Sequence, residues 1–209
     1  MLASHMPIAS EIETVAPGIC LWRVFDPAVR ADLFSTAIRM TNGSYLIDPV
    51  ALTPEATAEL NAHSPVRGII LTNENHARAA AGFADTFKVP IHGHAALLTG
   101  TGLLKVEPVK DRGVFASGLT AIEIDGGPLG EIAIHSSRDE GSMIMGDALI
   151  NFEPHGFAFL PPKYCSNAKT MRRSLSKLLE YDFERMLFAH GTPILTGAHD
   201  RVEELLRHH

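Results

Sequence analysis

The stretch Val66-Arg67-Gly68-Ile69-Ile70-Leu71-Thr72-Asn73-Glu74-Asn75-His76-Ala77-Arg78 sets the expected fold of the chain. Its first part places three apolar residues in succession, as a strand buried on both faces of a sheet does. A polar turn follows, and an alanine-rich segment then predicts a helix from about His76 to Phe87 that can pack closely on a sheet. This strand–turn–helix unit indicates an α/β fold with a mixed sheet covered by helices.

The flanking sequence extends this pattern in both directions. Upstream, residues 19–25 predict a strand, Asn42-Gly43 predicts the turn of a hairpin, and Thr53-Pro54 predicts the start of a short helix. Downstream, we expect short strands at 89–92, 103–109, 114–125, 132–135, 143–145 and 186–188, an irregular connection at 154–162, and helices at 167–179 and 198–206. We find no internal repeat and no linker, and we therefore expect one domain.

The bulk composition narrows the class of protein. The chain has 209 residues, of which 45% are hydrophobic and 20% charged, so it can bury a sizeable core. Its formal charge of −6 disfavours a nucleic-acid or anionic-membrane surface, since both need a concentrated positive field. Met1 to Met6 resembles a cloning remnant, which leaves residues 7–209 as the domain. With no signal segment and no long apolar run, we expect a soluble cytoplasmic protein of bacterial origin.

Five short motifs occur in an order that resembles one known family. They are Leu46-Ile47-Asp48, Leu71-Thr72, Gly126-Gly127-Pro128-Leu129-Gly130, Met145-Gly146-Asp147 and Ala189-His190-Gly191-Thr192-Pro193. In this order they resemble the strand ends and turns of the metallo-β-lactamase-like hydrolases, across nearly the whole chain. The resemblance implies a four-layer αββα sandwich, in which two mixed sheets are flanked by helices.

The resemblance also implies a metal pair, zinc or iron, held by five histidines and two aspartates. Carried over one position at a time, most of these ligands are missing: the positions hold Asn73, Asn75, Ala77, Arg78, Gly127, Asp147 and His190. Only Asp147 and His190 keep a family ligand, and asparagine amides are poor partners for zinc. We therefore expect no cofactor, with one weakly bound zinc or iron ion as the alternative.

Two other pairs have a spacing that could chelate a metal. Glu74 and His76 lie two residues apart, as do His92 and His94, and alternate residues of an extended segment share a face. A simpler interpretation is that His76 begins the alanine-rich helix. For His92 and His94, at a strand end, we expect solvent contact or a helix cap.

The substituted positions suggest a different use of the pocket. We expect Arg78 and Asp147 to form an ion pair in place of the metal, on a polar floor shared with His190, Asn73 and Asn75. With His76 added, these residues are the predicted binding site for a small polar or anionic molecule. Asp147 and His190 are also the catalytic candidates, because an oriented imidazole can serve as a general base.

Three functions remain open from the sequence. The first is a member with a degenerate active site that binds a small polar or anionic molecule or a protein partner. The second is a working hydrolase that uses a single metal or the Asp147–His190 pair, and the third is a structural or homo-oligomeric protein with a vestigial pocket. The sequence does not decide whether the polar loop from Ser136 to Ser142 covers the pocket.

Overall fold

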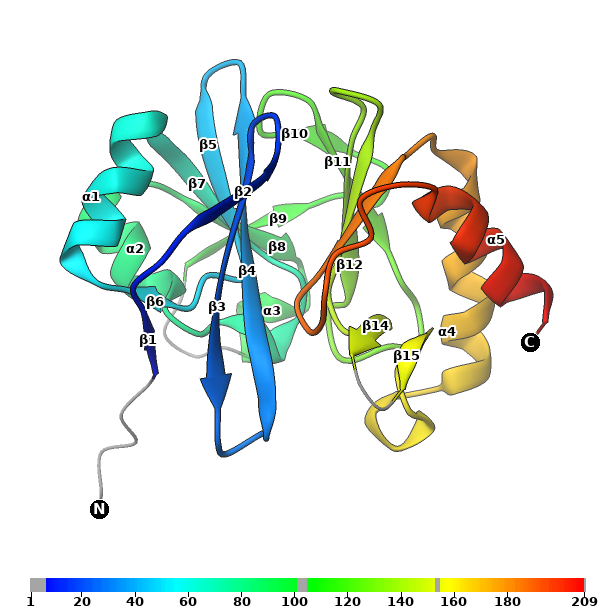
Figure 1. Cartoon of the computed structure of the whole chain (residues 1–209). Helices are drawn as coiled ribbons and strands as arrows, with labels where there is room; N and C mark the ends of the chain where they lie inside the picture. Colours follow the sequence, from blue (N-terminus) through cyan, green and yellow to red (C-terminus); the bar gives the residue numbers. More distant parts are fainter. Residues whose placement is uncertain (1–6, 101–104, 153–154, 209) are drawn as a thin grey trace.

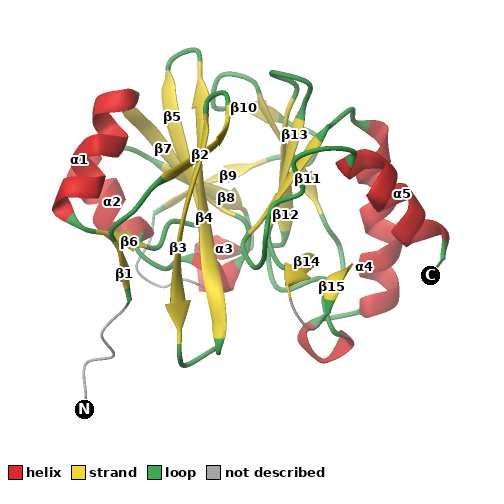
Figure 2. Cartoon of the chain, viewed as in Figure 1, coloured by secondary structure: helices red, strands yellow, loops and turns green. Residues whose placement is uncertain are grey.

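The computed structural model describes residues 7–100, 105–152 and 155–208, which form four layers. Two β-sheets face each other in the middle, with α1 (Pro54–His63) and α2 (Ala80–Phe87) outside the first sheet (Figures 1 and 2). Helices α4 (Ala168–Ser174) and α5 (Ala198–Arg207) lie outside the second. The expected αββα sandwich of two mixed sheets is confirmed.

The first sheet has seven strands in the order β2-β3-β4-β5-β7-β8-β9. Its first four strands pair antiparallel, and β5, β7, β8 and β9 then pair in parallel. The strands are β2 (Glu13–Ala16), β3 (Ile19–Asp26), β4 (Ala31–Met40), β5 (Gly43–Ile47), β7 (Val66–Leu71), β8 (Ile91–His94) and β9 (Val106–Val109).

The second sheet has five strands in the order β10-β11-β12-β13-β16. Only its last pair, β13 with β16, is parallel. The strands are β10 (Val114–Phe115), β11 (Leu119–Glu123), β12 (Ile132–Ser136), β13 (Ser142–Met145) and β16 (Arg185–Phe188). Smaller elements are the parallel pair β1 (Ile8–Ala9) and β6 (Ala51–Leu52), the antiparallel pair β14 (Leu149–Phe152) and β15 (Gly156–Phe159), and α3 (Leu97–Gly100).

Three apolar clusters hold the four layers together, one for each interface between layers. Leu60 of α1 and Phe83 of α2 pack on the outer face of the first sheet. Between the sheets, Ile70 of β7 and Ile134 of β12 belong to one cluster. Met171 of α4 belongs to the third cluster, on the outer face of the second sheet. Each sheet is thus buried on both faces, which explains the near-continuous apolar run of β7.

Local sequence signals explain where several elements begin. Thr53 accepts a hydrogen bond from the Ala56 amide and caps α1, with Pro54 at the first helical position. The hairpin of β4 and β5 is confirmed, but it turns at Thr41-Asn42, one residue before the predicted Asn42-Gly43, because Gly43 already pairs with Met40. Gly43 has a φ of +137°, and a Cβ there would lie 2.4 Å from the Pro65 carbonyl oxygen, so glycine is required.

The structure corrects three of the predicted elements. The helix expected from His76 begins at Ala80, because a 3₁₀ turn at Glu74–His76 and the positive φ of Arg78 delay it. The strand expected at 89–92 is shifted to Ile91–His94. The connection expected to be irregular contains β15, and its partner β14 was also missed. No helix among the described residues is both long and apolar enough to cross a membrane.

Candidate functional site

The site lies where four strands end at one rim of the sandwich. Asp48 follows β5 and Thr72 follows β7, while Asp147 and His190 lie just beyond β13 and β16. Because β5 is parallel to β7 and β13 is parallel to β16, the carboxyl ends of each pair meet at the same edge. Glu131 joins them because β12 runs antiparallel to β13. The two sheets are linked here by a hydrogen bond from the Ile132 amide to the Thr72 carbonyl, 2.8 Å long.

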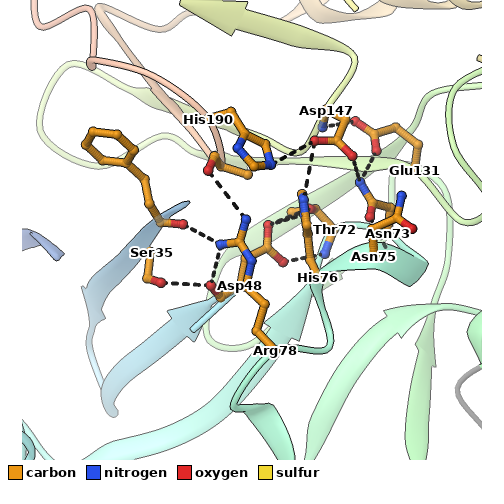
Figure 3. Close-up of polar contacts among 12 residues, drawn as sticks. Ser35, Asp48, Thr72, Asn73, Asn75, His76, Arg78, Glu131, Asp147 and His190 are labelled. Atoms are coloured by element: carbon orange, nitrogen blue, oxygen red, sulfur yellow. Dashed lines mark hydrogen bonds and ion pairs between the residues drawn. The ribbon is translucent and has the colours of Figure 1, made fainter. Parts of the chain in front are cut away.

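Asp48 organises the turn after β7 (Figure 3). Its Oδ1 accepts the Thr72 amide at 2.9 Å, and its Oδ2 accepts the Thr72 hydroxyl at 2.5 Å. The same Oδ2 lies 2.9 Å from Nδ1 of His76. A carboxylate can only accept, so Nδ1 of His76 carries the proton and donates it to Asp48. The imidazole is thereby fixed in orientation.

His76 is the centre of the network. Its side chain is 2% exposed, and its Nε2 lies 3.3 Å from Oδ1 of Asp147. The contact has ion-pair distance without hydrogen-bond alignment, so Nε2 has no hydrogen-bond partner in the described part of the chain. Burial alone would lower the pKa of His76, but the carboxylates of Asp147 and Asp48 outweigh it and raise the pKa to about 9. The expectation that His76 merely starts a helix is therefore wrong.

Asn73 joins two carboxylates from the second sheet. Its amide nitrogen donates to Glu131 Oε2 at 2.7 Å and to Asp147 Oδ2 at 3.0 Å. Its oxygen accepts the backbone amide of Asn75 at 2.9 Å. Asn73 thus fixes one oxygen of Asp147 and leaves Oδ1 facing the histidines (Figure 3).

Glu131 is a buried acid that the sequence did not indicate. Its side chain accepts the backbone amides of Asp147 and Ala148, both at 2.8 Å. Burial and the Asp147 charge raise the pKa of Glu131 to about 8. Burial would also raise the pKa of Asp147, but His76 and His190 hold it well below its ordinary range. The two neighbouring carboxyl groups therefore differ strongly in acidity.

Arg78 makes contacts other than the predicted ones. Its guanidinium donates to three backbone carbonyls: Phe34 at 2.6 Å, Asp48 at 2.9 Å and Ala189 at 3.4 Å. The direct ion pair expected between Arg78 and Asp147 is not among the ion pairs of the described residues. His76 and His190 occupy that position at Asp147 instead. Arg78 therefore ties the first sheet to the second at the rim.

His190 completes the cluster from the second sheet. Its Nε2 lies 3.4 Å from Asp147 Oδ1, and its ring centroid lies 5.6 Å from that of His76. Burial lowers the pKa of His190 to about 4, although Asp147 and a hydrogen bond with the Asp32 backbone oppose this. With this pKa, His190 is neutral at physiological pH, and its Nε2 faces the carboxylate of Asp147.

The residues present do not fit the metal pair of the related hydrolases. Asn73 and Arg78, at two family ligand positions, are engaged with carboxylates and carbonyls of the protein itself. Gly127, at a third, offers no donor, and a Cβ there would meet the side chain of Glu131 at 3.0 Å. One group of donors does remain: ligand atoms of His76, Asp147 and His190 lie within 4.8 Å of one another. Among the described residues, this cluster could hold one ion.

A cavity of about 1050 Å³ opens above this network. Its polar floor contains His76, Arg78, Asp147 and His190, with Asn75 beside them. Its walls are mostly apolar and come from β4, from β14 and from nearby connections. They include Val29, Ala31, Leu33, Val50, Ile150, Phe152, Leu160 and Tyr164. The Ser136–Ser142 loop does not line it, since this loop joins the opposite ends of β12 and β13.

The sequence located most of the cluster but not its supports. Asn73, His76, Arg78, Asp147 and His190 come together as expected, whereas the Asn75 side chain is exposed. His92 and His94 lie elsewhere: His94 accepts the Ala96 amide, a cap as expected, and His92 faces Glu107 at 3.7 Å. The missed residues are Asp48, Thr72 and Glu131. Asp48 and Thr72 stand in the quoted motifs, but Glu131 lies just outside one.

Comparison with known proteins agrees with this geometry. The family described as metallo-beta-lactamase superfamily matches residues 13–208. No curated protein matches the chain.

Among solved structures, DIM-1 metallo-beta-lactamase superposes with a TM-score of 0.76 at 10% identity, over 98% of this chain and 99% of that one. A metallo-beta-lactamase from Pontibacter korlensis gives 0.73 at 12% identity, over 95% and 99%. A metallo-beta-lactamase family protein from Thermus thermophilus gives 0.67 at 19% identity, over 94% and 80%. These likenesses show the fold, and the family match goes further: the chain belongs to the metallo-beta-lactamase superfamily.

Proposed function

We propose that this protein binds a small molecule with a polar or anionic head in the cavity and does not perform two-metal hydrolysis. The observation that carries the proposal is that the side chains at two family ligand positions are engaged by the protein itself. Asn73 bridges two carboxylates and Arg78 bridges three carbonyls, so these side chains serve the protein's own polar network beneath an open cavity.

The composition of the cavity supports a ligand with two parts. Ligand pockets are typically concave and apolar, with a few convergent polar groups that fix orientation. Here the apolar walls surround a floor on which Arg78 and His190 are the groups suited to a polar or anionic head. Three N–H groups of Arg78 are used by carbonyls, out of the five that a guanidinium carries. Arg30 and Lys163 at the wall add two further permanent positive charges.

Calorimetric titration of chelator-treated protein with acetate and hexanoate tests this proposal. Both carboxylates should bind at one site, and hexanoate should bind more tightly, by about 0.8 kcal/mol or fourfold for each methylene buried. Replacing Ala31 with Trp fills the cavity and should abolish binding, because Ala31 lines its wall. The matched control is Val114→Trp, at a 73% exposed position outside the cavity. Absence of saturable binding of either acid, both to the chelator-treated protein and after addition of zinc, would overturn the proposal.

A second function is favoured by one specific observation, the convergence of His76, Asp147 and His190. A hydrolase could use a single metal there, or could use neutral His190 as a base oriented by Asp147. A chromogenic ester assay with and without added zinc, compared with His190→Ala, checks this alternative. Activity that is equal in the variant would exclude it. Homo-oligomerisation, a protein partner and a cytoplasmic location stay predictions.

A further inference from the structure

One buried nitrogen in the network has an ion-pair contact but no aligned hydrogen bond among the described residues. Nε2 of His76 is aimed at the floor of the cavity, in a side chain that is 2% exposed. Leaving a buried polar nitrogen unsatisfied costs about 1–3 kcal/mol. Two further donor atoms, Asp147 Oδ1 and His190 Nε2, face the same point.

We propose that His76, Asp147 and His190 form a mononuclear site for a divalent transition metal, with zinc the best match. The site differs from the family's metal pair in number and in ligands, because His76 stands between two family positions, Asn75 and Ala77. This inference deepens the proposed function. It rests on that function in one respect only, that the cavity is the binding pocket.

The distances between the donor atoms suit one tetrahedral ion. Zinc bonds to nitrogen and oxygen ligands are about 2.0–2.1 Å long, which places two ligands of a tetrahedron about 3.3–3.4 Å apart. Asp147 Oδ1 lies 3.3 Å from His76 Nε2 and 3.4 Å from His190 Nε2. Two imidazoles and one carboxylate are a donor set typical of catalytic zinc. A metal here displaces the proton on His76 Nε2, which leaves to solvent.

Each of the three ligands is held by a second contact on its far side. A metal-bound histidine almost always donates its other ring N–H to a carboxylate or carbonyl. Nδ1 of His76 faces Asp48 at 2.9 Å, and His190 bonds to the backbone of Asp32. Asn73 holds the second oxygen of Asp147 at 3.0 Å. In the related hydrolases the position of Asn73 carries a metal ligand, whereas here Asn73 orients the proposed ligand Asp147.

Charge also favours a cation. Three carboxyl groups, those of Asp48, Glu131 and Asp147, are connected to this cluster, together with one guanidinium, that of Arg78. Glu131 is uncharged at neutral pH because its pKa is raised to about 8, so with neutral imidazoles the carboxylates of Asp48 and Asp147 exceed the charge of Arg78 by one, and the cluster attracts a cation. Arg78 is held on the carbonyls of Phe34, Asp48 and Ala189, so its charge is already partly compensated.

The three ligands all line the cavity, so the remaining coordination position of the metal would face it. An open position is the mark of a metal that binds a ligand or water, whereas a structural zinc is closed by four protein ligands. A carboxylate or similar head could occupy that position. The metal would thus be the anchor for the polar part of the bound molecule.

Zinc titration of chelator-treated protein, purified without a nickel column, tests the inference. Calorimetry with a competing chelator should give one zinc per chain, and cobalt in its place should give a visible spectrum of a tetrahedral nitrogen–oxygen site. His190→Ala and His76→Gln should each weaken zinc binding by more than about 100-fold. Asp48→Asn should weaken it by about 10- to 100-fold at unchanged stoichiometry.

His94→Ala is the matched control. His94 Nε2 also lies 3.2 Å from a carboxylate oxygen, that of Glu123, but belongs to no group of three donors among the described residues. Its loss should therefore leave zinc binding unchanged. If His76→Gln does not fold, as circular dichroism would show, His190→Ala decides, since that side chain is partly exposed.

Two zinc ions per chain, or binding that survives His190→Ala, would overturn the inference. The carboxylate titration keeps the two proposals apart. Hexanoate binding without zinc binding would refute the metal site alone. Zinc binding without hexanoate binding to either form would refute the small-molecule pocket alone.

Discussion

The two sheets contribute to the site in different ways. The second sheet keeps Asp147 and His190 at the positions the superfamily uses for its metals. The first sheet contributes a turn in which the family ligand positions hold amide, alanine and guanidinium side chains, and its working imidazole, His76, stands at an unrelated position. The fold therefore preserves where the polar groups converge. Most of the exchanged ligand positions lie in the turn of the first sheet, and one, Gly127, lies between β11 and β12 of the second.

This difference shows that most of the chemistry of a site can change through one turn. Asp48 positions the rebuilt turn through three contacts, to the Thr72 amide, the Thr72 hydroxyl and His76. The retained side is positioned by Glu131, through the amides of Asp147 and Ala148. Each sheet supplies its own supporting carboxylate, and Asn73 connects the two sets.

The largest effect should come from breaking the rebuilt side at Arg78. Arg78→Met keeps much of the side-chain volume but leaves three carbonyls without their donor, so unfolding free energy should fall by about 3 kcal/mol. Urea unfolding followed by circular dichroism measures this. Asn75→Ala in the same turn is the control, and its exposed side chain should contribute less than about 0.5 kcal/mol. Equal losses in both variants would contradict the role given to Arg78.

The retained side can be broken at Gly146, beside Asp147. A Cβ there would lie 2.7 Å from Thr72 Oγ1 and 2.8 Å from Glu131 Oε1. Gly146→Ala should therefore destabilise the fold by about 2 kcal/mol, through forced displacement of both polar groups. Gly82→Ala in α2, where a Cβ meets nothing within 4 Å, should instead stabilise it by about 0.5–1 kcal/mol. If the packing at Gly146 is as described, the melting temperature falls in Gly146→Ala and rises in Gly82→Ala, which thermal unfolding measures.

The smallest expected effect is on the pH dependence of stability and concerns His92, a histidine outside the site. Burial lowers the pKa of His92 from its ordinary value of 6.5, with Glu107 opposing this. The unfolded chain therefore binds the proton more readily than the folded chain, so this contribution to stability is full above pH 6.5 and declines as the pH falls below it. Urea unfolding between pH 7.5 and about 5 should show a shallower decline in His92→Gln than in the native protein. Parallel curves would contradict the prediction.

Much of the fold could be predicted because its signals are local. The apolar run Val66–Leu71 and the Thr53-Pro54 cap each act within a few residues, and both are confirmed. The hairpin signal at Asn42-Gly43 also gave a hairpin, with its turn one residue earlier. Strand β15 was missed because Gly156–Phe159 pairs only with the short β14 and has no alternating pattern of its own. The helix after Thr72 was placed too early, since Asn73 caps a 3₁₀ turn.

Most residues of the site could be predicted from the sequence, but the contacts between them could not. Motif positions brought Arg78, Asp147 and His190 together, because strand ends at one edge of a sheet converge whatever their side chains. The partners of Arg78 could not be predicted, since they are backbone carbonyls, which every residue has. The central role of His76 depends on a 3₁₀ turn that directs its ring inward.

The three carbonyls held by Arg78 also bear on the order in which the molecule is assembled. Phe34 and Asp48 belong to the early part of the chain, but Ala189 lies 111 residues after Arg78. A nascent or truncated chain that ends before β16 can build the first sheet and its helices, yet it has neither His190 nor the last carbonyl. Closing a contact between such distant segments costs chain entropy and is slow. The floor of the cavity therefore stays incomplete until β16 and the residues after it are in place.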